Sequence, residues 1–309
     1  MDKEVGVIVN LGAPKNSDAR AARAFLAQFL SDGCVLPLPF PLRQLVARLI
    51  ARKRAGHYAE MLREISAGGV HPLLRNTELL AGKVGLKLGL PVAAAYRYGG
   101  KSIAEVVEKL RADGVRKIFF VPLYPHETPS TTHSARREIL RACGGIYAHI
   151  SPAYFDDALF IDALARTVPP ECDAVVASFH SVPLSHAAKT PYAAQCARTA
   201  ELLAQRLGRK VEVAFQSKMG RGKWLEPNIE SVVSDIIGGG AKRVCVIAPS
   251  FACDCSETLV ELDRGLRLFC AARGAELLLC PCLNYSDAHA EVVARLFAKI
   301  GYAKKGYLI

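Results

Sequence analysis

Thiols and carboxylates crowd the segment Ala248–Asp263, which reads APSFACDCSETLVELD. The segment overlaps an apolar run, Val244–Pro249, of the kind that forms a fully buried strand. Ligands of open α/β sheets bind outside the carboxyl ends of the strands, so we predict that this segment is one half of a site. Its carboxylates, Asp254, Glu257 and Glu261, suit metal binding or proton transfer.

Cysteine is frequent in this chain, with ten residues, and its spacing bears on metal binding. Cys253 with Cys255, and Cys280 with Cys282, form C-x-C pairs, whereas zinc sites and ferredoxin-type clusters use C-x-x-C or longer spacings. We therefore interpret most of the cysteines as buried small apolar side chains. Cys255 stays a candidate because it lies among the carboxylates.

An imidazole follows another apolar run, because Ala174–Phe179 leads directly into His180. A histidine at the carboxyl end of a strand is either a base or metal ligand, or a structural residue. Glu257 and Glu261 are four residues apart and would share one face of an α-helix. Imidazole with carboxylate suits Fe²⁺. Because there is no third histidine, the pattern favours a site that a metal ion passes through over one that holds it permanently.

Two loops add further candidates. The loop Tyr124–Ser134 (YPHETPSTTHS) holds two histidines and several hydroxyls after an apolar run. Trp224, the only tryptophan, lies in a loop after the strand Val211–Phe215. It either offers a flat face to a flat ligand or packs within its own loop.

Alternation of apolar runs with helical patterns predicts parallel βαβ units and an α/β fold. The expected strands, most of them followed by a polar or Gly/Pro-marked turn, are Val5–Leu11, Val92–Tyr98, Lys117–Leu123, Ala174–Phe179, Val211–Phe215, Arg243–Pro249 and Glu276–Cys282.

An internal repeat indicates two similar domains. Ser102–Pro125 and Asn228–Phe251 share a helix, a glycine stop, a basic residue and an apolar strand with a closing proline. We predict two Rossmann-like domains, each a parallel sheet flanked by helices, that face each other across a cleft. The predicted domains are residues 1–155 and residues 156–309. The first carries the apolar segment Val35–Ile50, which we expect to form the lip of the active site, and the second carries His180 and Glu257.

The chain has 309 residues and a formal net charge of +11, a balance that attracts anionic partners. No zinc finger, RNP-like strand or long basic arm accompanies the charge, so we predict no nucleic-acid partner. No G-x-G-x-x-G or G-x-x-x-x-G-K-[ST] motif follows a strand and no G-x-S-x-G elbow is present, which argues against a phosphate cradle and a serine hydrolase.

The amino-terminal residues MDKEVGVIVNLG lack the basic region and cleavage site of a signal peptide, so we expect a cytoplasmic protein. Val35–Ile50 is apolar and broken by prolines, and it is followed by the basic residues ARKR. It is shorter than the roughly 20 residues of a membrane-spanning helix. We expect it to contact a membrane peripherally, on the inner face of the cell membrane.

Seven sequence blocks in order resemble the ferrochelatases, enzymes of haem synthesis. The blocks are VNLGAP (Val9–Pro14), FLSDGCVLPLP (Phe29–Pro39), YRYGGKSI (Tyr96–Ile103), VPLYPHETPSTTHSA (Val121–Ala135), SFHSVP (Ser178–Pro183), FQSKMGRGKWLEP (Phe215–Pro227) and CDCSETLVELD (Cys253–Asp263). The resemblance implies a lyase that inserts Fe²⁺ into a porphyrin, with protoporphyrin IX favoured. Insertion into coproporphyrin III or a sirohydrochlorin-type ring, and a carrier without enzymatic activity, are the alternatives.

The resemblance also implies residue roles. His180 matches the catalytic histidine of the family and Glu257 its partner carboxylate, and both are expected to hold the metal. Asp254, Glu261 and Cys255 match positions on a path for protons or iron. The expected substrate-binding residues are Trp224, Arg54, Arg97, Leu62 and His71.

The chain departs from the family pattern at several positions. Leu62 and the Gly69-Val70-His71-Pro72 turn replace a tyrosine and a glycine-serine-proline turn, which puts propionate recognition there in doubt. Pro129 and His133 replace the usual Ser or Cys and Gly. No cysteine-rich extension that could carry a [2Fe–2S] cluster follows, so we predict no cluster and no tightly bound cofactor. Fe²⁺ is expected to be a substrate.

Overall fold

The computed structural model describes residues 3–66, 69–218 and 222–304. By its contacts the chain divides into two compact units. Unit 1 comprises Met1–Leu123, Pro129–Pro152 and Tyr285–Ile309, and unit 2 comprises Tyr124–Thr128 and Ala153–Asn284.

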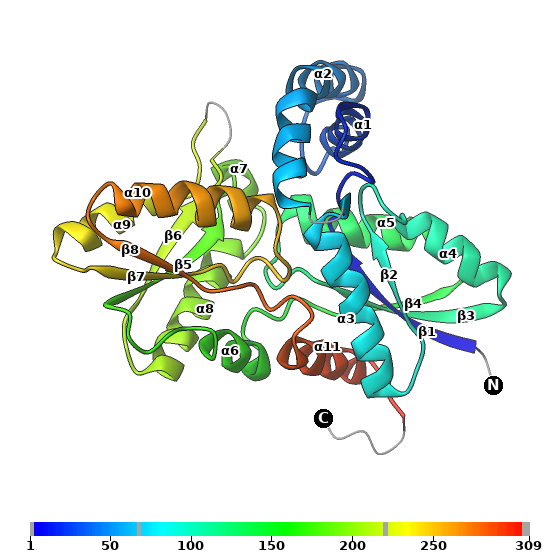
Figure 1. Cartoon of the computed structure of the whole chain (residues 1–309). Helices are drawn as coiled ribbons and strands as arrows, with labels where there is room; N and C mark the ends of the chain where they lie inside the picture. Colours follow the sequence, from blue (N-terminus) through cyan, green and yellow to red (C-terminus); the bar gives the residue numbers. More distant parts are fainter. Residues whose placement is uncertain (1–2, 67–68, 219–221, 305–309) are drawn as a thin grey trace. The chain divides into compact units, whose positions relative to one another are not determined.

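Each unit is built on a four-stranded parallel sheet (Figure 1). The sheet of unit 1 has the order β2-β1-β3-β4 and that of unit 2 the order β6-β5-β7-β8. The strands of unit 1 are β1 (Lys3–Asn10), β2 (Val92–Tyr96), β3 (Val115–Pro122) and β4 (Tyr147–Ile150), and those of unit 2 are β5 (Ala174–His180), β6 (Val211–Gln216), β7 (Arg243–Ile247) and β8 (Glu276–Leu279). The two orders are equivalent, and the repeated segments supply corresponding strands, β3 and β7. The predicted α/β class with two similar Rossmann-like sheets is confirmed.

Helices cover both faces of each sheet, as parallel strands require. In unit 1, α4 and α5 cover one face and α3 and α11 the other; in unit 2, α9 and α10 cover one face and α6 and α8 the other (Figure 1). The helices of unit 1 are α1 (Ala19–Leu30), α2 (Phe40–Ile65), α3 (Pro72–Leu88), α4 (Ile103–Ala112), the π-helix η2 (Pro129–His133), α5 (Ser134–Ala142) and α11 (Asp287–Lys299). Those of unit 2 are α6 (Ala158–Ala165), α7 (Leu184–Ala187), α8 (Tyr192–Leu207), α9 (Ile229–Gly238), the π-helix η3 (Glu257–Leu266) and α10 (Arg267–Ala271).

All seven predicted strands are present, with ends within a few residues of the prediction. The strand that the sequence did not reveal is β4, which has four residues and an alternating exposed pattern. Its first residue, Tyr147, is 78% exposed. A short edge strand of this kind lacks the continuous apolar run of a buried one.

The predicted domain boundary at residues 155/156 lies close to Ala153, where the chain enters unit 2 for its longest stretch. The last helix, α11, lies within the predicted second domain but belongs to unit 1, where it packs on α3 and β3. Tyr302, which follows α11, stacks on Phe119 of β3 and donates a hydrogen bond from its hydroxyl to the carbonyl of Pro91 at 2.6 Å. Unit 1 therefore consists of segments from both ends of the chain.

The helical hairpin of unit 1 is formed by α1 and α2, which pack against each other. Along α2 the buried residues Ala47, Ala51, Ala55 and Ala59 recur every four residues, so small side chains form one stripe that lets α1 approach closely. The described part of the chain contains no helix that is long and apolar enough to cross a membrane.

Candidate active site

His180 is the last residue of β5, at the carboxyl edge of the sheet of unit 2. Its Nδ1 lies 2.5 Å from the carbonyl oxygen of Ser181. Only a protonated Nδ1 can donate to that oxygen, so the hydrogen bond leaves Nε2 of the neutral ring as the proton acceptor. The backbone around His180 is fixed by Tyr192, whose hydroxyl donates to the carbonyl of His180 at 2.7 Å. The ring is therefore oriented as a base or ligand.

Glu257 is the first residue of η3, and its carboxyl interacts electrostatically with His180. Burial alone would raise the pKa of this carboxyl, but the charge that His180 carries when protonated and hydrogen bonds from Cys255 and Ser256 outweigh it and hold the pKa below its usual range. The Ser256 hydroxyl donates to Glu257 Oε2 at 2.7 Å. Gln216, at the end of β6, fixes the backbone by donating to the carbonyl of Glu257 at 3.1 Å. Glu257 is thus positioned to be ionised beside an imidazole.

Glu261 is exposed, and its carboxylate accepts a hydrogen bond from the Ser217 hydroxyl at 2.5 Å. Its pKa is shifted in the opposite direction to that of Glu257. Although the residue as a whole is exposed, nearby protein atoms partly desolvate its carboxyl. This desolvation and the charge of Glu257 raise the pKa, and the Ser217 hydrogen bond counteracts them. Two carboxyls one turn apart therefore differ in proton affinity, and the one that binds protons more readily lies nearer solvent.

The turn that carries both glutamates is a π-helix rather than the α-helix that the spacing predicted. Hydrogen bonds of the i→i+5 type run through Glu257–Leu266 before the chain continues as α10. Such segments are short and concentrate at functional sites. The two glutamates still share a face of this helix, because a turn with i→i+5 hydrogen bonds holds more than the 3.6 residues of an α-helical turn and brings residues four apart closer to alignment.

Asp254 and Cys255 precede η3 in a loop held by side chains. Asn284 donates from Nδ2 to Asp254 Oδ2 at 2.6 Å and accepts from the Asp254 backbone N–H at 2.9 Å. The Cys255 backbone N–H donates to Thr258 Oγ1 at 3.0 Å. The Cys255 thiol is buried, and burial together with the charge of Glu257 raises its pKa well above the usual value. Cys255 is thus a protonated thiol next to Glu257.

Trp224 lies partly buried in a loop that pairs with the segment after His180. Residues Pro183 and Trp224 form an isolated antiparallel bridge. The Ser181 hydroxyl donates to the carbonyl of Leu225 at 3.0 Å. The loop of the tryptophan and the histidine strand are thereby joined, while Met219, Gly220 and Arg221 of the predicted FQSKMGRGKWLEP block lie outside the described residues.

The basic residues predicted to bind substrate belong to unit 1. Arg97, one residue past β2, contacts Asp32 Oδ2 at 2.5 Å and the Ser134 hydroxyl at 2.7 Å. Its charge is therefore neutralised within the unit. Arg54 is exposed on α2.

Leu62 and His71 have roles inside unit 1. Leu62 is 1% exposed and packs with Ala22 and Ala59 between α1 and α2. His71 is buried and caps α3, because its Nδ1 accepts from the Leu73 backbone N–H at 3.2 Å. The contact of Leu62 and His71 with substrate stays a prediction.

Asp32 is a buried hub that the sequence did not identify. In addition to Arg97, its carboxylate binds Arg137 at 2.6 Å and accepts hydrogen bonds from the hydroxyls of Tyr98 at 2.9 Å and Ser134 at 2.5 Å. Although burial would raise the pKa of Asp32, these hydrogen bonds and the Arg97 charge hold it far below its usual range. The partners are 65 to 105 residues away in sequence, so only the resemblance of the FLSDGCVLPLP block marked this segment.

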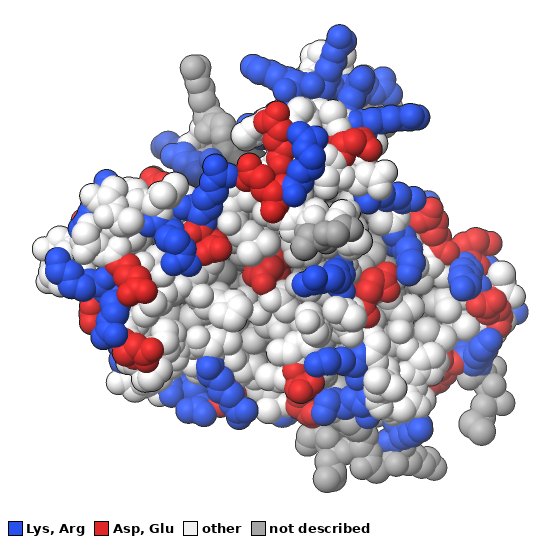
Figure 2. Space-filling model, viewed as in Figure 1, with Lys and Arg blue, Asp and Glu red and all other residues white. Residues whose placement is uncertain are grey.

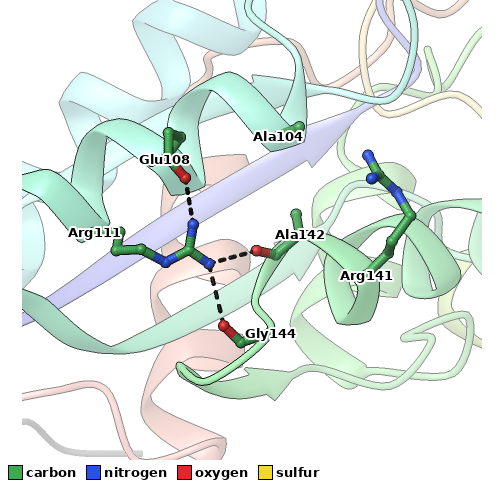
Figure 3. A pocket seen from close by; sticks show the side chains of 6 residues that line it. All are labelled: Ala104, Glu108, Arg111, Arg141, Ala142 and Gly144. Carbon is green, nitrogen blue, oxygen red and sulfur yellow. Dashed lines mark hydrogen bonds and ion pairs between the residues drawn. The ribbon is translucent and has the colours of Figure 1, made fainter.

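A depression of about 450 Å³ on α4 and α5 is unrelated to these residues (Figure 3). Its central side chain, Arg111, pairs with Glu108 and donates to the carbonyls of Ala142 at 2.8 Å and Gly144 at 3.3 Å. These contacts connect α4 to the end of α5, so the guanidinium is a structural link.

The ten cysteines are free thiols, and nine of them are buried. The Sγ atoms of Cys245 in β7 and Cys280, one residue past β8, are 3.3 Å apart. In the described parts of the chain no three His, Cys, Asp or Glu side chains are grouped so that they could hold a metal ion.

The chain is similar to known proteins over nearly its whole length. The family model "Ferrochelatase" matches residues 4–300. Ferrochelatase of Pseudomonas aeruginosa (strain LESB58) is 33% identical and the alignment covers 97% of this chain and 99% of the relative. Ferrochelatase of Azotobacter vinelandii is 35% identical, with 94% and 97% covered.

Solved structures share the fold at low sequence identity. SirB from Bacillus subtilis with Fe³⁺ has a TM-score of 0.59 and 14% identity over 96% of this chain and 95% of that chain. DR2241 from Deinococcus radiodurans, described as structurally similar to chelatases, has a TM-score of 0.53 and 18% identity over 96% of this chain and 55% of that chain. The fold, the seven ordered blocks and the full-length relatives lead to one conclusion: the chain belongs to the ferrochelatase family.

Proposed function

We propose that this protein inserts Fe²⁺ into the free base of protoporphyrin IX. The observation that carries the proposal is the pairing in unit 2 of a histidine with a fixed tautomer, His180, and a glutamate, Glu257, whose pKa is lowered. Insertion replaces two inner N–H protons of the ring by one divalent ion, so two protons must leave. A carrier that only holds a tetrapyrrole has no need for such a pair of proton acceptors.

Proton transfer follows from the order of proton affinities. Nε2 of His180 is the free acceptor of the ring, and an imidazole nitrogen is a suitable base for a pyrrole N–H. Glu257, with its lowered pKa, passes a proton readily to Glu261, whose pKa is raised. Glu261 is exposed and releases the proton to water. The same carboxylates offer oxygen ligands to the incoming Fe²⁺.

Asp254 and Cys255 support this route at its inner end. Asn284 fixes the orientation of the Asp254 carboxylate, and the Cys255 thiol donates to Glu257. We assign both residues to the path for protons or iron, with Cys255 keeping the Glu257 carboxylate in place.

Distortion of the macrocycle is the second requirement of insertion, since a planar ring hides its nitrogen lone pairs. Binding energy from the rim of the ring can supply the roughly 1–5 kcal/mol that such strain costs. We assign to Trp224 the contact of its indole ring with the face of the macrocycle. We assign to the exposed Arg54 an electrostatic contact with the propionates.

An anaerobic insertion assay tests the proposal. Protoporphyrin IX, coproporphyrin III and sirohydrochlorin are each offered with Fe²⁺ or Zn²⁺, and the absorbance of the metallated ring is followed. We expect protoporphyrin IX to react fastest. Faster metallation of another ring would replace the substrate, and tight binding without metallation of any ring would make the protein a carrier.

Variants then test the two residues. His180→Ala and Glu257→Gln are each expected to lower the rate about 100-fold to 10,000-fold, the range for the loss of a positioned base. Glu230→Gln, at an exposed position in the first turn of α9, is the matched control and should keep the wild-type rate. Wild-type rates in both His180→Ala and Glu257→Gln would refute the mechanism.

We further propose peripheral membrane contact through Val35–Ile50, which would place the protein at the inner face of the cell membrane. The support is a row of exposed apolar side chains, Phe40, Leu42, Leu45 and Leu49, on the first half of α2. Lys and Arg gather over the same helical hairpin (Figure 2), as expected for attraction to anionic lipid. Sedimentation with phosphatidylglycerol vesicles tests this: Leu45→Glu/Leu49→Glu should abolish binding, and equal binding by both proteins would refute it.

A further inference from the structure

A depression of about 850 Å³ lies wholly within unit 1, between α3 and α4. It is lined by apolar and charged side chains and by the end of β2: Lys15, Val70, Leu74, Arg75, Glu78, Leu79, Tyr96, Gly100, Lys101, Glu105, Val106 and Lys109. None of these residues has a role in the site of unit 2 or in the network around Asp32. Its volume is within the range typical of small-molecule sites.

Apolar side chains form much of the lining. Val70 and Leu79 are 48% and 44% exposed, and Leu74 and Val106 line the same space. The Tyr96 hydroxyl is occupied, because it donates to the carbonyl of Leu74 at 3.1 Å. The depression therefore offers an apolar surface whose exposure to water is unfavourable and which an apolar ligand would cover.

The charged side chains of the lining are unequally paired. Glu78 binds Lys101 at 3.0 Å. Glu105 is held by the capping box of α4, where its carboxylate accepts from the Ser102 backbone N–H at 2.7 Å. Both carboxylates of the lining are thus already occupied.

The three remaining cations make no ion pair among the residues that the structure describes. Lys15, Arg75 and Lys109 have no acidic side chain within salt-bridge distance, and Lys15 acts on Glu105 only through its field. An apolar basin bordered by unpaired cations is complementary to an apolar molecule with an acidic group.

We propose that this depression binds a small apolar carboxylate, with the apolar body against Leu74, Leu79 and Val106 and the carboxylate beside Arg75 and Lys109. A fatty-acyl carboxylate and the propionate edge of a tetrapyrrole share this chemistry. All lining residues belong to unit 1, whereas the insertion chemistry is assigned to residues of unit 2, so different variants test the two assignments.

Three fluorescent probes with one body and different head groups test the charge requirement. Pyrenebutyrate, pyrenebutanol and pyrenebutylamine are titrated into the wild-type protein. We expect the butyrate to bind about tenfold or more tightly than the alcohol, the gain typical of a charge-assisted hydrogen bond, and the amine to bind most weakly. Equal affinity for the three probes would refute a carboxylate site.

Variants locate the bound probe. Arg75→Glu and Lys109→Glu should each weaken pyrenebutyrate about tenfold or more, and Leu79→Ser should weaken the butyrate and the alcohol alike. Arg116→Glu makes the same charge change at an exposed position of unit 1 outside the lining and should bind as the wild type does. Wild-type affinity in both lining charge variants would overturn the proposal.

Binding in the insertion site must be distinguished from binding here. Glu257→Gln and His180→Ala should bind pyrenebutyrate normally, and Arg75→Glu should keep the wild-type insertion rate. Loss of probe binding in the unit 2 variants, with normal binding in Arg75→Glu, would assign the probe to the insertion site and refute the proposal. Displacement of the probe by decanoate or by coproporphyrin III identifies the source of the carboxylate, and displacement by neither would refute the ligand class.

Discussion

Between pH 7.5 and pH 5 the wild-type protein is expected to lose about 2 kcal/mol of its free energy of unfolding through His126. The variant His126→Gln should be spared this part of the loss. His126 is 3% exposed, and its Nε2 lies 2.9 Å from Thr199 Oγ1. The rings of Phe179 and Tyr192 meet the imidazole edge-on at centroid distances of 5.2 and 6.0 Å. This burial lowers the pKa of His126 from 6.5 to about 3, so the folded chain keeps the ring neutral.

The sign and size of the effect follow from proton linkage. Below pH 6.5 the imidazole of the unfolded chain takes up a proton that the folded chain does not bind until about pH 3. Stability therefore falls as pH falls through this window. At pH 5 the difference from the unfolded pKa is about 1.5 units, and at roughly 1.4 kcal/mol per unit the loss is about 2 kcal/mol.

Urea denaturation followed by tryptophan fluorescence measures the effect in the right part of the molecule, because Trp224 is the only tryptophan and belongs to unit 2 as His126 does. The free energy of unfolding is compared at pH 7.5 and pH 5 for the wild type and His126→Gln. The glutamine amide can still bond to Thr199. His133→Gln, at the exposed last residue of η2 in unit 1, controls for the loss of an imidazole. Parallel losses in the wild type and His126→Gln would refute the reasoning.

Three further predictions concern other parts of the chain. Asp32→Asn should lower the free energy of unfolding by about 3 kcal/mol, because it leaves Arg97 and Arg137 without their buried carboxylate; an unchanged melting temperature would contradict this. Ser217→Ala should move the acid limb of the insertion rate to higher pH, because it removes the hydrogen bond that opposes the raised pKa of Glu261; a pH profile from 5 to 8 that matches the wild type would count against it. Protein purified without oxygen should contain neither iron nor acid-labile sulfide in stoichiometric amount, because the C-x-C spacing does not suit a cluster; one cluster per chain would disprove this.

The strands were predictable because each is a local pattern. Apolar runs such as Ala174–Phe179 and Val211–Phe215 are buried on both faces of a parallel sheet and end in polar turns, which the sequence displays directly. The four-residue edge strand β4 has neither property. Similarly, helical spacing indicated that Glu257 and Glu261 share a helix, but not that its hydrogen bonds shift to the i→i+5 pattern.

The candidate site was predictable where its residues follow strands, as His180 does, and where the blocks resemble the family. The contacts of the unit 1 residues were not predictable, because they join positions far apart in sequence. Arg97 could not be recognised as a neutralised cation without its contact to Asp32, and His71 could not be recognised as a helix cap without the start of α3 at Pro72.

The completion of unit 1 by α11 and Tyr302 has a consequence for the order of folding during synthesis. Gly6 of β1 lies so close to the Tyr302 ring that a Cβ there would be 2.7 Å from it, which shows how tightly the two ends of unit 1 pack. While a ribosome is still making α11, all residues of unit 2 have already been made. We therefore expect the second unit in the chain to be the first to complete its fold, and a nascent chain that ends at Asn284 to leave the apolar surface of β1 and β3 in need of protection.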